Sequence, residues 1–133
     1  MDASAIMAVI LNESNRGAVI ALTENATLLS PEVISFEIGN AFISLYKRKK
    51  LTEEELLAAF RLYAAMPIRN IKVDIEKALK IACKYKIYAY DAYYLEIAHR
   101  LKIPLLTFNL PMKKAGLDMK IKIPGKKTEK RQE

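Results

Sequence analysis

The chain has 133 residues, of which 52% are hydrophobic and 28% charged, so we expect one globular domain with its own core. Its single cysteine, Cys83, excludes an internal disulfide, and with only one histidine, His99, no zinc site can be built, which suits a cytoplasmic protein. The longest apolar run near the start, residues 5–11, is too short to span a membrane, and the net charge of +7 favours a polyanionic partner such as nucleic acid.

Helix and strand signals alternate along the chain. Short apolar segments predict four strands, at residues 26–30, 67–73, 104–108 and 118–123. Helices are predicted from about Ala3, at 13–25, 31–50, 51–66 and 74–86, from about Tyr90, and as a short turn after the third strand. Short strands joined by helices favour right-handed crossovers and a parallel sheet that is covered on both faces, which is an α/β fold.

Several predicted helices begin with recognisable capping signals. Pro31 and Glu32 fit the first turn of the third helix. Thr52 followed by Glu55 is typical of a capping box, and Asp74 fits an N-cap. These helix starts are therefore predicted from local chemistry alone.

Basic residues gather in two places. The tail, residues 124–133, holds four basic and two acidic residues and no apolar anchor, so we expect a domain at 1–123 followed by a disordered tail that is a candidate for binding nucleic acid. Elsewhere the candidate phosphate contacts are Lys47, Arg48, Lys49, Lys50 and Arg100. The simpler interpretation of each is a solvated basic face.

Asp2, Asp91 and Asn109 all lie near the start of a predicted helix. Each could be an ordinary N-cap, because a side-chain oxygen there accepts a free backbone N–H. In open parallel sheets, however, ligands bind beyond the C-terminal ends of the strands, where such residues lie. The three residues are therefore either caps or parts of one site.

Glu37 is harder to explain as a surface residue. It stands in a row at four-residue spacing with Val33, Ala41 and Leu45, which we expect to be buried, and Asn40 faces nearly the same way. A buried carboxylate needs a cation, a hydrogen-bond network or a raised pKa. The alternative is a partly exposed Glu at the edge of a narrow apolar stripe.

Asp91 shares its side of the predicted helix with Tyr94, Leu95 and Ala98, so its carboxylate is expected to point toward the sheet. Several inward-facing carboxylates suggest a hard divalent cation, because Mg²⁺ and Mn²⁺ prefer oxygen ligands and retain several waters. Such an ion can activate water for attack on a phosphodiester.

The segments "DASAI", "SPEVISFEIGNAF" and "YAYDAYYLEIAHRLKIPLLTFN", in this order, resemble the PIN-domain ribonucleases, and most closely the VapC toxins of VapBC toxin–antitoxin pairs. The resemblance runs from Asp2 to about Ile123. It implies a five-stranded parallel sheet in an α/β/α sandwich and a Mg²⁺- or Mn²⁺-dependent endoribonuclease that leaves 5′-phosphate and 3′-hydroxyl ends. It also implies a homodimer that is inhibited by an antitoxin protein.

On the matching positions, the resemblance implies roles for individual residues. The catalytic set is Asp2, Glu37, Asp91 and Asn109, with Asp2, Glu37 and Asp91 as metal ligands. The resemblance implies Ser4 and Thr107 as supporting hydroxyl residues, and Asn40 joins them because of its position beside Glu37.

Two features depart from the family pattern. The family has a hydrophobic central strand before its first Asp, whereas here only Met1 precedes Asp2, so we expect a poorly anchored Asp2 and a hole at the centre of the sheet. The family usually has Asp where this chain has Asn109, which is a weaker ligand. The alternative function is therefore a catalytically weak or inactive PIN-like module that binds RNA or protein. In an unrelated α/β domain, these residues would instead lie far apart.

Two other groups of side chains invite a functional interpretation. The tyrosines at 88–94 could stack on RNA bases, but we interpret them as core and dimer packing. His99 is interpreted as a surface or interface residue and not as a general base.

Overall fold

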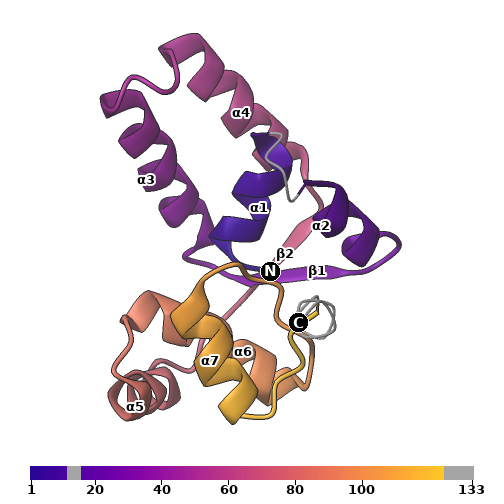
Figure 1. Cartoon of the computed structure of the whole chain (residues 1–133), viewed down its shortest axis with the longest axis vertical. Coiled ribbons are helices and arrows are strands. Elements are labelled where there is room, and N and C mark those ends of the chain that lie inside the picture. Colours follow the sequence, from indigo (N-terminus) through magenta and orange to yellow (C-terminus); the bar gives the residue numbers. More distant parts are fainter. Residues whose placement is uncertain (12–15, 125–133) are drawn as a thin grey trace, which may run out of the picture.

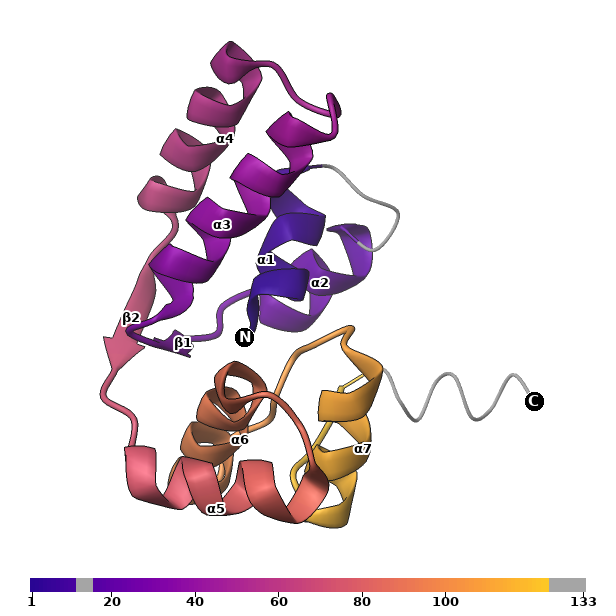
Figure 2. The same cartoon turned by 90° about the vertical axis from the view of Figure 1, so that its left-hand side faces the viewer.

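The computed structural model describes residues 1–11 and 16–124. In this part of the chain a parallel pair of strands lies between two groups of helices, with α1 to α4 on one side and α5 to α7 on the other (Figures 1 and 2). The elements are α1 (Ala3–Ile10), α2 (Arg16–Thr23), β1 (Leu28–Pro31), α3 (Ile34–Lys47), α4 (Glu53–Ala65), β2 (Ile68–Ile71), α5 (Ile75–Tyr85), α6 (Ala89–Leu101) and α7 (Leu110–Asp118). The predicted α/β fold with a parallel sheet is confirmed.

Local capping signals explain several element boundaries. The Thr52 hydroxyl accepts a hydrogen bond from the Glu55 N–H, and the Glu55 carboxylate accepts one from the Thr52 N–H, so the predicted capping box is present. Asp74 caps α5, as predicted. The prediction that Pro31 lies in the first turn of a helix is wrong: Pro31 ends β1, opposite Ile71, where a residue without an N–H is tolerated.

The sheet is smaller than predicted, because within the described residues only β1 and β2 pair as strands. Residues 104–108 are extended without a ladder, and α7 takes Asp118 from the predicted last strand. A single backbone hydrogen bond, from Leu105 N–H to Lys122 C=O at 2.9 Å, joins these two segments. The prediction of five strands is therefore wrong for this part of the chain.

The first two residues occupy the place between β1 and the extended segment. The ammonium of Met1 donates to the Leu29 carbonyl at 3.1 Å, and the Asp2 N–H donates to the Leu106 carbonyl, also at 3.1 Å. Beside Met1 lies a cavity of about 210 Å³, lined mostly by apolar residues from both flanks: Ala26, Leu28, Leu29, Ile103, Pro104 and Leu106. Met1 and Asp2 thus bridge β1 and the segment at 104–108, which pairs with no strand of the described residues.

One apolar core joins the two helical groups. It contains the buried side chains of Ile6 from α1, Ile38 and Phe42 from α3, Leu95 from α6 and Met112 from α7. Each such side chain stabilises the fold by roughly 1.5–3 kcal/mol relative to an exposed one. Because the core spans both groups, it fixes α1, α3 and α6, the three helices that carry the predicted acids, relative to one another. Among the described residues, no helix is long and apolar enough to cross a membrane.

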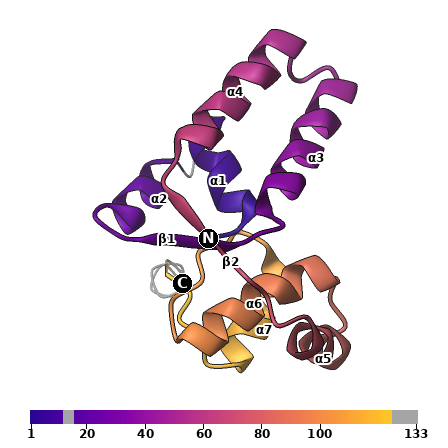
Figure 3. The ribbon, with the colours of Figure 1, turned by 180° about the vertical axis from the view of Figure 1, so that it is seen from behind.

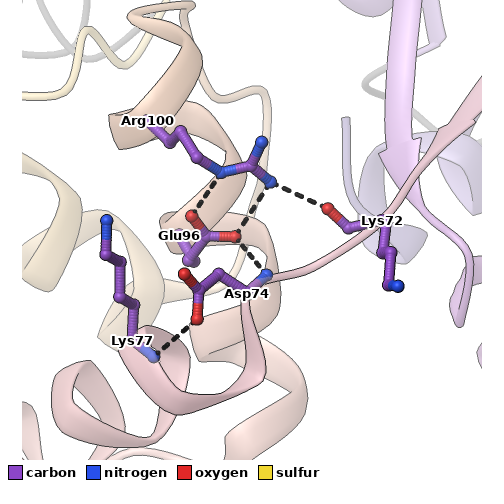
Figure 4. Close-up of polar contacts among 5 residues, drawn as sticks. All are labelled: Lys72, Asp74, Lys77, Glu96 and Arg100. Atoms are coloured by element: carbon purple, nitrogen blue, oxygen red, sulfur yellow. Dashed lines mark hydrogen bonds and ion pairs between the residues drawn. The ribbon is translucent and has the colours of Figure 1, made fainter.

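A polar contact that the sequence did not suggest fixes α6 further (Figure 4). Glu96 is only 3% exposed, and its carboxylate accepts hydrogen bonds from the Asp74 N–H at 2.9 Å and from Arg100 Nε at 2.7 Å. Arg100 also donates to the Lys72 carbonyl at 2.8 Å. The pair therefore ties the segment after β2 and the start of α5 to α6. Viewed from behind, the helices α5, α6 and α7 form one block below the sheet (Figure 3).

Candidate active site

Asp2 combines the two roles that its position suggested, because it caps α1 and is also buried, at 4% exposure. Its Oδ1 accepts hydrogen bonds from the Ser4 hydroxyl at 2.7 Å and from the Ala5 N–H at 3.1 Å, and its Oδ2 accepts one from the Thr107 hydroxyl. The prediction of a poorly anchored Asp2 is therefore wrong. Burial raises the pKa of Asp2, while these donors and the Met1 ammonium oppose the shift.

Glu37 lies in the first turn of α3 and is half-buried. Its Oε1 accepts a hydrogen bond from the hydroxyl of Tyr94 on α6, and its other oxygen has no hydrogen-bond partner among the described residues. Burial raises the pKa of Glu37, the Tyr94 hydroxyl lowers it, and the charges of Asp2 and Asp91 raise it further. Burial also raises the pKa of Tyr94 well above its ordinary value, so its hydroxyl stays a donor.

Asp91 lies in the first turn of α6 but is not an N-cap, because the helix begins at Ala89 with Tyr88 as the capping residue. That interpretation of Asp91 is therefore wrong. In the described part of the chain its carboxylate has no hydrogen-bond partner. Burial raises the pKa of Asp91, and the charge of Asp2 adds to this shift. The charge of Asp2, at the start of α1, therefore acts on carboxylates of both α3 and α6.

Asn109 lies close to Asp2 through a shared neighbour, not through a direct contact. Its Oδ1 accepts the Met112 N–H at 2.9 Å and so caps α7, while its own N–H donates to the Thr107 hydroxyl at 3.0 Å. The same hydroxyl donates to Asp2, and the Ser4 hydroxyl accepts the Phe108 N–H at 2.9 Å. Ser4 and Thr107 thus support the predicted cluster, and Asn109 acts as a cap beside it.

An open pocket of about 480 Å³ lies beside Glu37. Glu37 and Asn40 of α3 line it, and so do Ala3 and Tyr90, the chain neighbours of Asp2 and Asp91. Phe36 lines it as well, although the sequence analysis gave Phe36 no role. A usable signal was present, because Phe36 and Tyr90 each directly precede a predicted acid.

The predicted phosphate contacts fall on different surfaces. Lys47, Lys49 and Lys50 line a second open pocket with Thr52 and Glu55, where α3 leads into α4. Ten residues of helix separate Glu37 from Lys47, which is roughly 15 Å at 1.5 Å per residue. Arg100 is held by Glu96 and the Lys72 carbonyl, so we assign it a structural role.

Residues 1–116 match the family model of the PIN domain. The chain belongs to the PIN-domain family. PIN domains are generally nucleases, and the Glu37 carboxylate at an open pocket suits nuclease chemistry. None of the curated proteins matches this PIN domain significantly.

PIN nucleases generally use divalent metal ions, for which the three acids are the candidate ligands. Within residues 1–11 and 16–124, no three His, Cys, Asp or Glu side chains lie close enough together to hold a metal ion. The donors nevertheless have the right chemistry: among the described residues, Asp91 and one oxygen of Glu37 have no hydrogen-bond partner, and the charge of Asp2 raises the pKa of both acids. Mg²⁺ is often bound by only one or two carboxylates together with waters and substrate phosphates. This PIN domain fits such an ion, but without a closed ligand shell.

Proposed function

We propose that this PIN domain is a divalent-metal-dependent endoribonuclease and the toxin of a toxin–antitoxin pair. The observation that carries the proposal is that Asp2, Glu37 and Asp91, which are far apart in the sequence, lie close enough for the charge of Asp2 to raise the pKa of the other two, while Glu37 lines an open pocket. Such an arrangement costs stability unless a cation offsets the charge. A functional role of these three carboxylates is the simplest explanation for an arrangement that lowers stability.

Each acid has a separate task in this proposal. Asp2 is held rigidly by Ser4 and Thr107, so it orients whatever it binds. Tyr94 positions Glu37 through one oxygen and leaves the other available. Asp91, which has no hydrogen-bond partner in the described part of the chain, completes the set, and Asn109 lies at its edge. A bound Mg²⁺ or Mn²⁺ would supply an activated water and offset the charge that develops on the phosphodiester.

The test is hydrolysis of tRNA and rRNA by the purified chain in Mg²⁺, Mn²⁺ or EDTA. Hydrolysis should require the metal, leave 5′-phosphate and 3′-hydroxyl ends, and disappear in Asp91→Asn. The matched control is Asp118→Asn, because Asp118 is exposed at the end of α7 and contacts only Tyr85 among the described residues. Full activity in Asp91→Asn would exclude the proposed chemistry.

A second candidate function is an inactive PIN module that binds RNA or protein. It is favoured by the lack of a three-ligand cluster in the described ranges and by the use of the Asn109 oxygen as a cap. Calorimetry separates the two candidates. Tight divalent-ion binding that is lost in Glu37→Gln argues for the nuclease, and no detectable binding argues for the inactive module.

The toxin role, the antitoxin partner, the homodimer and the cytoplasmic location are further parts of the proposal, and they rest on the resemblance to VapC toxins. Expression of the wild-type chain should arrest growth of a bacterial host, and Asp91→Asn should relieve the arrest. Growth arrest by both forms would separate toxicity from hydrolysis. Light scattering on the purified chain tests the dimer.

A further inference from the structure

Two large aromatic side chains lie exposed at the open pocket that Glu37 lines. Phe36 of α3 is 78% exposed, and Tyr90 of α6 is 52% exposed. Both line the same pocket as Glu37. Single exposed apolar residues are common on protein surfaces, but two aromatic rings from different helices at one pocket are a stronger sign of a ligand.

The core does not use these rings. Phe42, on the same helix as Phe36, is fully buried, and so is Tyr94, on the same helix as Tyr90. Tyr90 makes an edge contact with Tyr93, with ring centroids 5.7 Å apart and planes at 82°, which fixes its orientation and leaves about half of its surface free. Of the tyrosines interpreted as core and dimer packing, Tyr94 packs in the core of the chain and Tyr90 does not.

Polar side chains continue the row that Phe36 begins. Phe36, Asn40 and Ser44 follow one another at four-residue spacing along α3, and all three line the pocket. An amide can donate to and accept from the edge of a base, and a hydroxyl can do the same. The row therefore offers a flat apolar surface next to hydrogen-bonding groups.

The charge of the pocket favours a neutral ligand over an anion. Among the described residues that line it there is no Lys or Arg, and Glu37 contributes a carboxylate. A free phosphate would be repelled there, whereas the face of a nucleobase would not. A volume of about 480 Å³ is within the range of small-ligand pockets.

We propose that Phe36 and Tyr90 hold an unpaired RNA base between or against their rings, with Asn40 hydrogen-bonding to its edge, so that the neighbouring phosphate reaches the carboxylates. This rests on the proposed nuclease function and adds to it two positioning residues, Phe36 and Tyr90, that would set where the RNA backbone lies relative to Glu37. Base-paired RNA is excluded from the pocket because its bases are already stacked and paired.

The test uses the full chain in an Asp91→Asn background, which stops hydrolysis while binding is measured. The probe is a single-stranded RNA that carries one 2-aminopurine, whose fluorescence is quenched on stacking, and the absence of Trp from the sequence removes protein fluorescence that would overlap. Affinity and quenching should both fall by at least about fivefold in Phe36→Leu and in Tyr90→Leu. Phe36→Tyr keeps a ring and should retain both.

Tyr88→Leu is the matched control, because Tyr88 is 81% exposed on the same stretch as Tyr90 but does not line the pocket. It should bind as the parent does, and a duplex of the same sequence should bind more weakly than the single strand. In the active chain, Phe36→Leu should raise KM more than it lowers kcat.

Unchanged RNA affinity in both Phe36→Leu and Tyr90→Leu would overturn the proposal, and so would equal losses in Tyr88→Leu. If the two leucine variants instead dissociate a dimer and leave RNA affinity unchanged, the surface is a protein interface and the proposal is wrong. Binding that depends on Phe36 in a chain that never hydrolyses RNA would support the base site and refute only the nuclease function.

Discussion

Tyr94→Phe isolates the contact between α6 and Glu37. The substitution removes the hydroxyl that donates to Glu37 Oε1 and keeps the buried ring in the core. Burial and the charges of Asp2 and Asp91 then raise the pKa of Glu37 without opposition. We expect the acid limb of the pH–rate profile of RNA hydrolysis to move to higher pH.

The size of the shift follows from the strength of the lost hydrogen bond. A hydrogen bond to a charged group is worth about 1.5–3 kcal/mol, and we take the lower end because Glu37 is only half-buried. Since one pH unit corresponds to 1.36 kcal/mol, the limb should move by about one unit. Below that pH, hydrolysis should be roughly tenfold slower than in the wild type, and well above it the two should agree more closely.

Tyr63→Phe is the matched control for this substitution. Tyr63 is also buried, and its hydroxyl is hydrogen-bonded to the Ser35 hydroxyl at 2.8 Å. Tyr63→Phe should lower the free energy of unfolding by about 1 kcal/mol and Tyr94→Phe by about 1.5 kcal/mol, each seen as a fall of a few degrees in Tm. Only Tyr94→Phe should move the pH profile. An unmoved profile in Tyr94→Phe, or an equal movement in Tyr63→Phe, would refute the reasoning.

Three further predictions test the supports of the site. In urea unfolding, Thr107→Val should lower the free energy of unfolding by about 1–3 kcal/mol, because Asp2 loses a buried hydrogen-bond donor. Thr107→Ser keeps a hydroxyl and should retain most of the wild-type stability. Arg100→Met should lower the free energy of unfolding by about 2–4 kcal/mol, because the buried Glu96 carboxylate loses its cation. Lys80→Met, which breaks the exposed pair with Glu76 at 3.9 Å, should lower it by less than about 0.5 kcal/mol, and equal losses in the two variants would contradict this prediction. Because burial raises the pKa of Glu37, the folded state binds more protons than the unfolded state. Stability in EDTA should therefore fall as pH rises from about 4 through the raised pKa, and less steeply in Glu37→Gln.

The sequence predicted features that depend on near neighbours. The capping box at Thr52 and the cap at Asp74 involve residues only three positions apart, and both are present. The strand predicted at 104–108 failed for the opposite reason. Its apolar character is real, since Leu105 and Leu106 are buried, but a ladder requires partners that local sequence does not encode.

In the candidate site, too, features that depend on near neighbours were predicted and contacts between distant residues were not. The positions of Asp2 and Glu37 were predicted from helix starts and periodicity, helped by the family resemblance. The hydrogen bond from Tyr94 to Glu37 spans 57 residues, and no local pattern indicates it. Glu96 was missed although Arg100 stands four residues later, because the same spacing is typical of exposed surface pairs.

The reciprocal hydrogen bonds of Ser4 and Thr107 determine how the start of α1 and the segment before α7 unfold locally. The start of α1 and the segment before α7 are linked in both directions, by Thr107 to Asp2 and by the Phe108 N–H to Ser4. Neither can fray without removing donors or acceptors from the other. In hydrogen exchange, the amides of Ala5, Phe108 and Asn109 should therefore exchange as one cooperative unit with a common opening free energy. Loss of the acid site and release of the α7 end of the molecule would then be a single event.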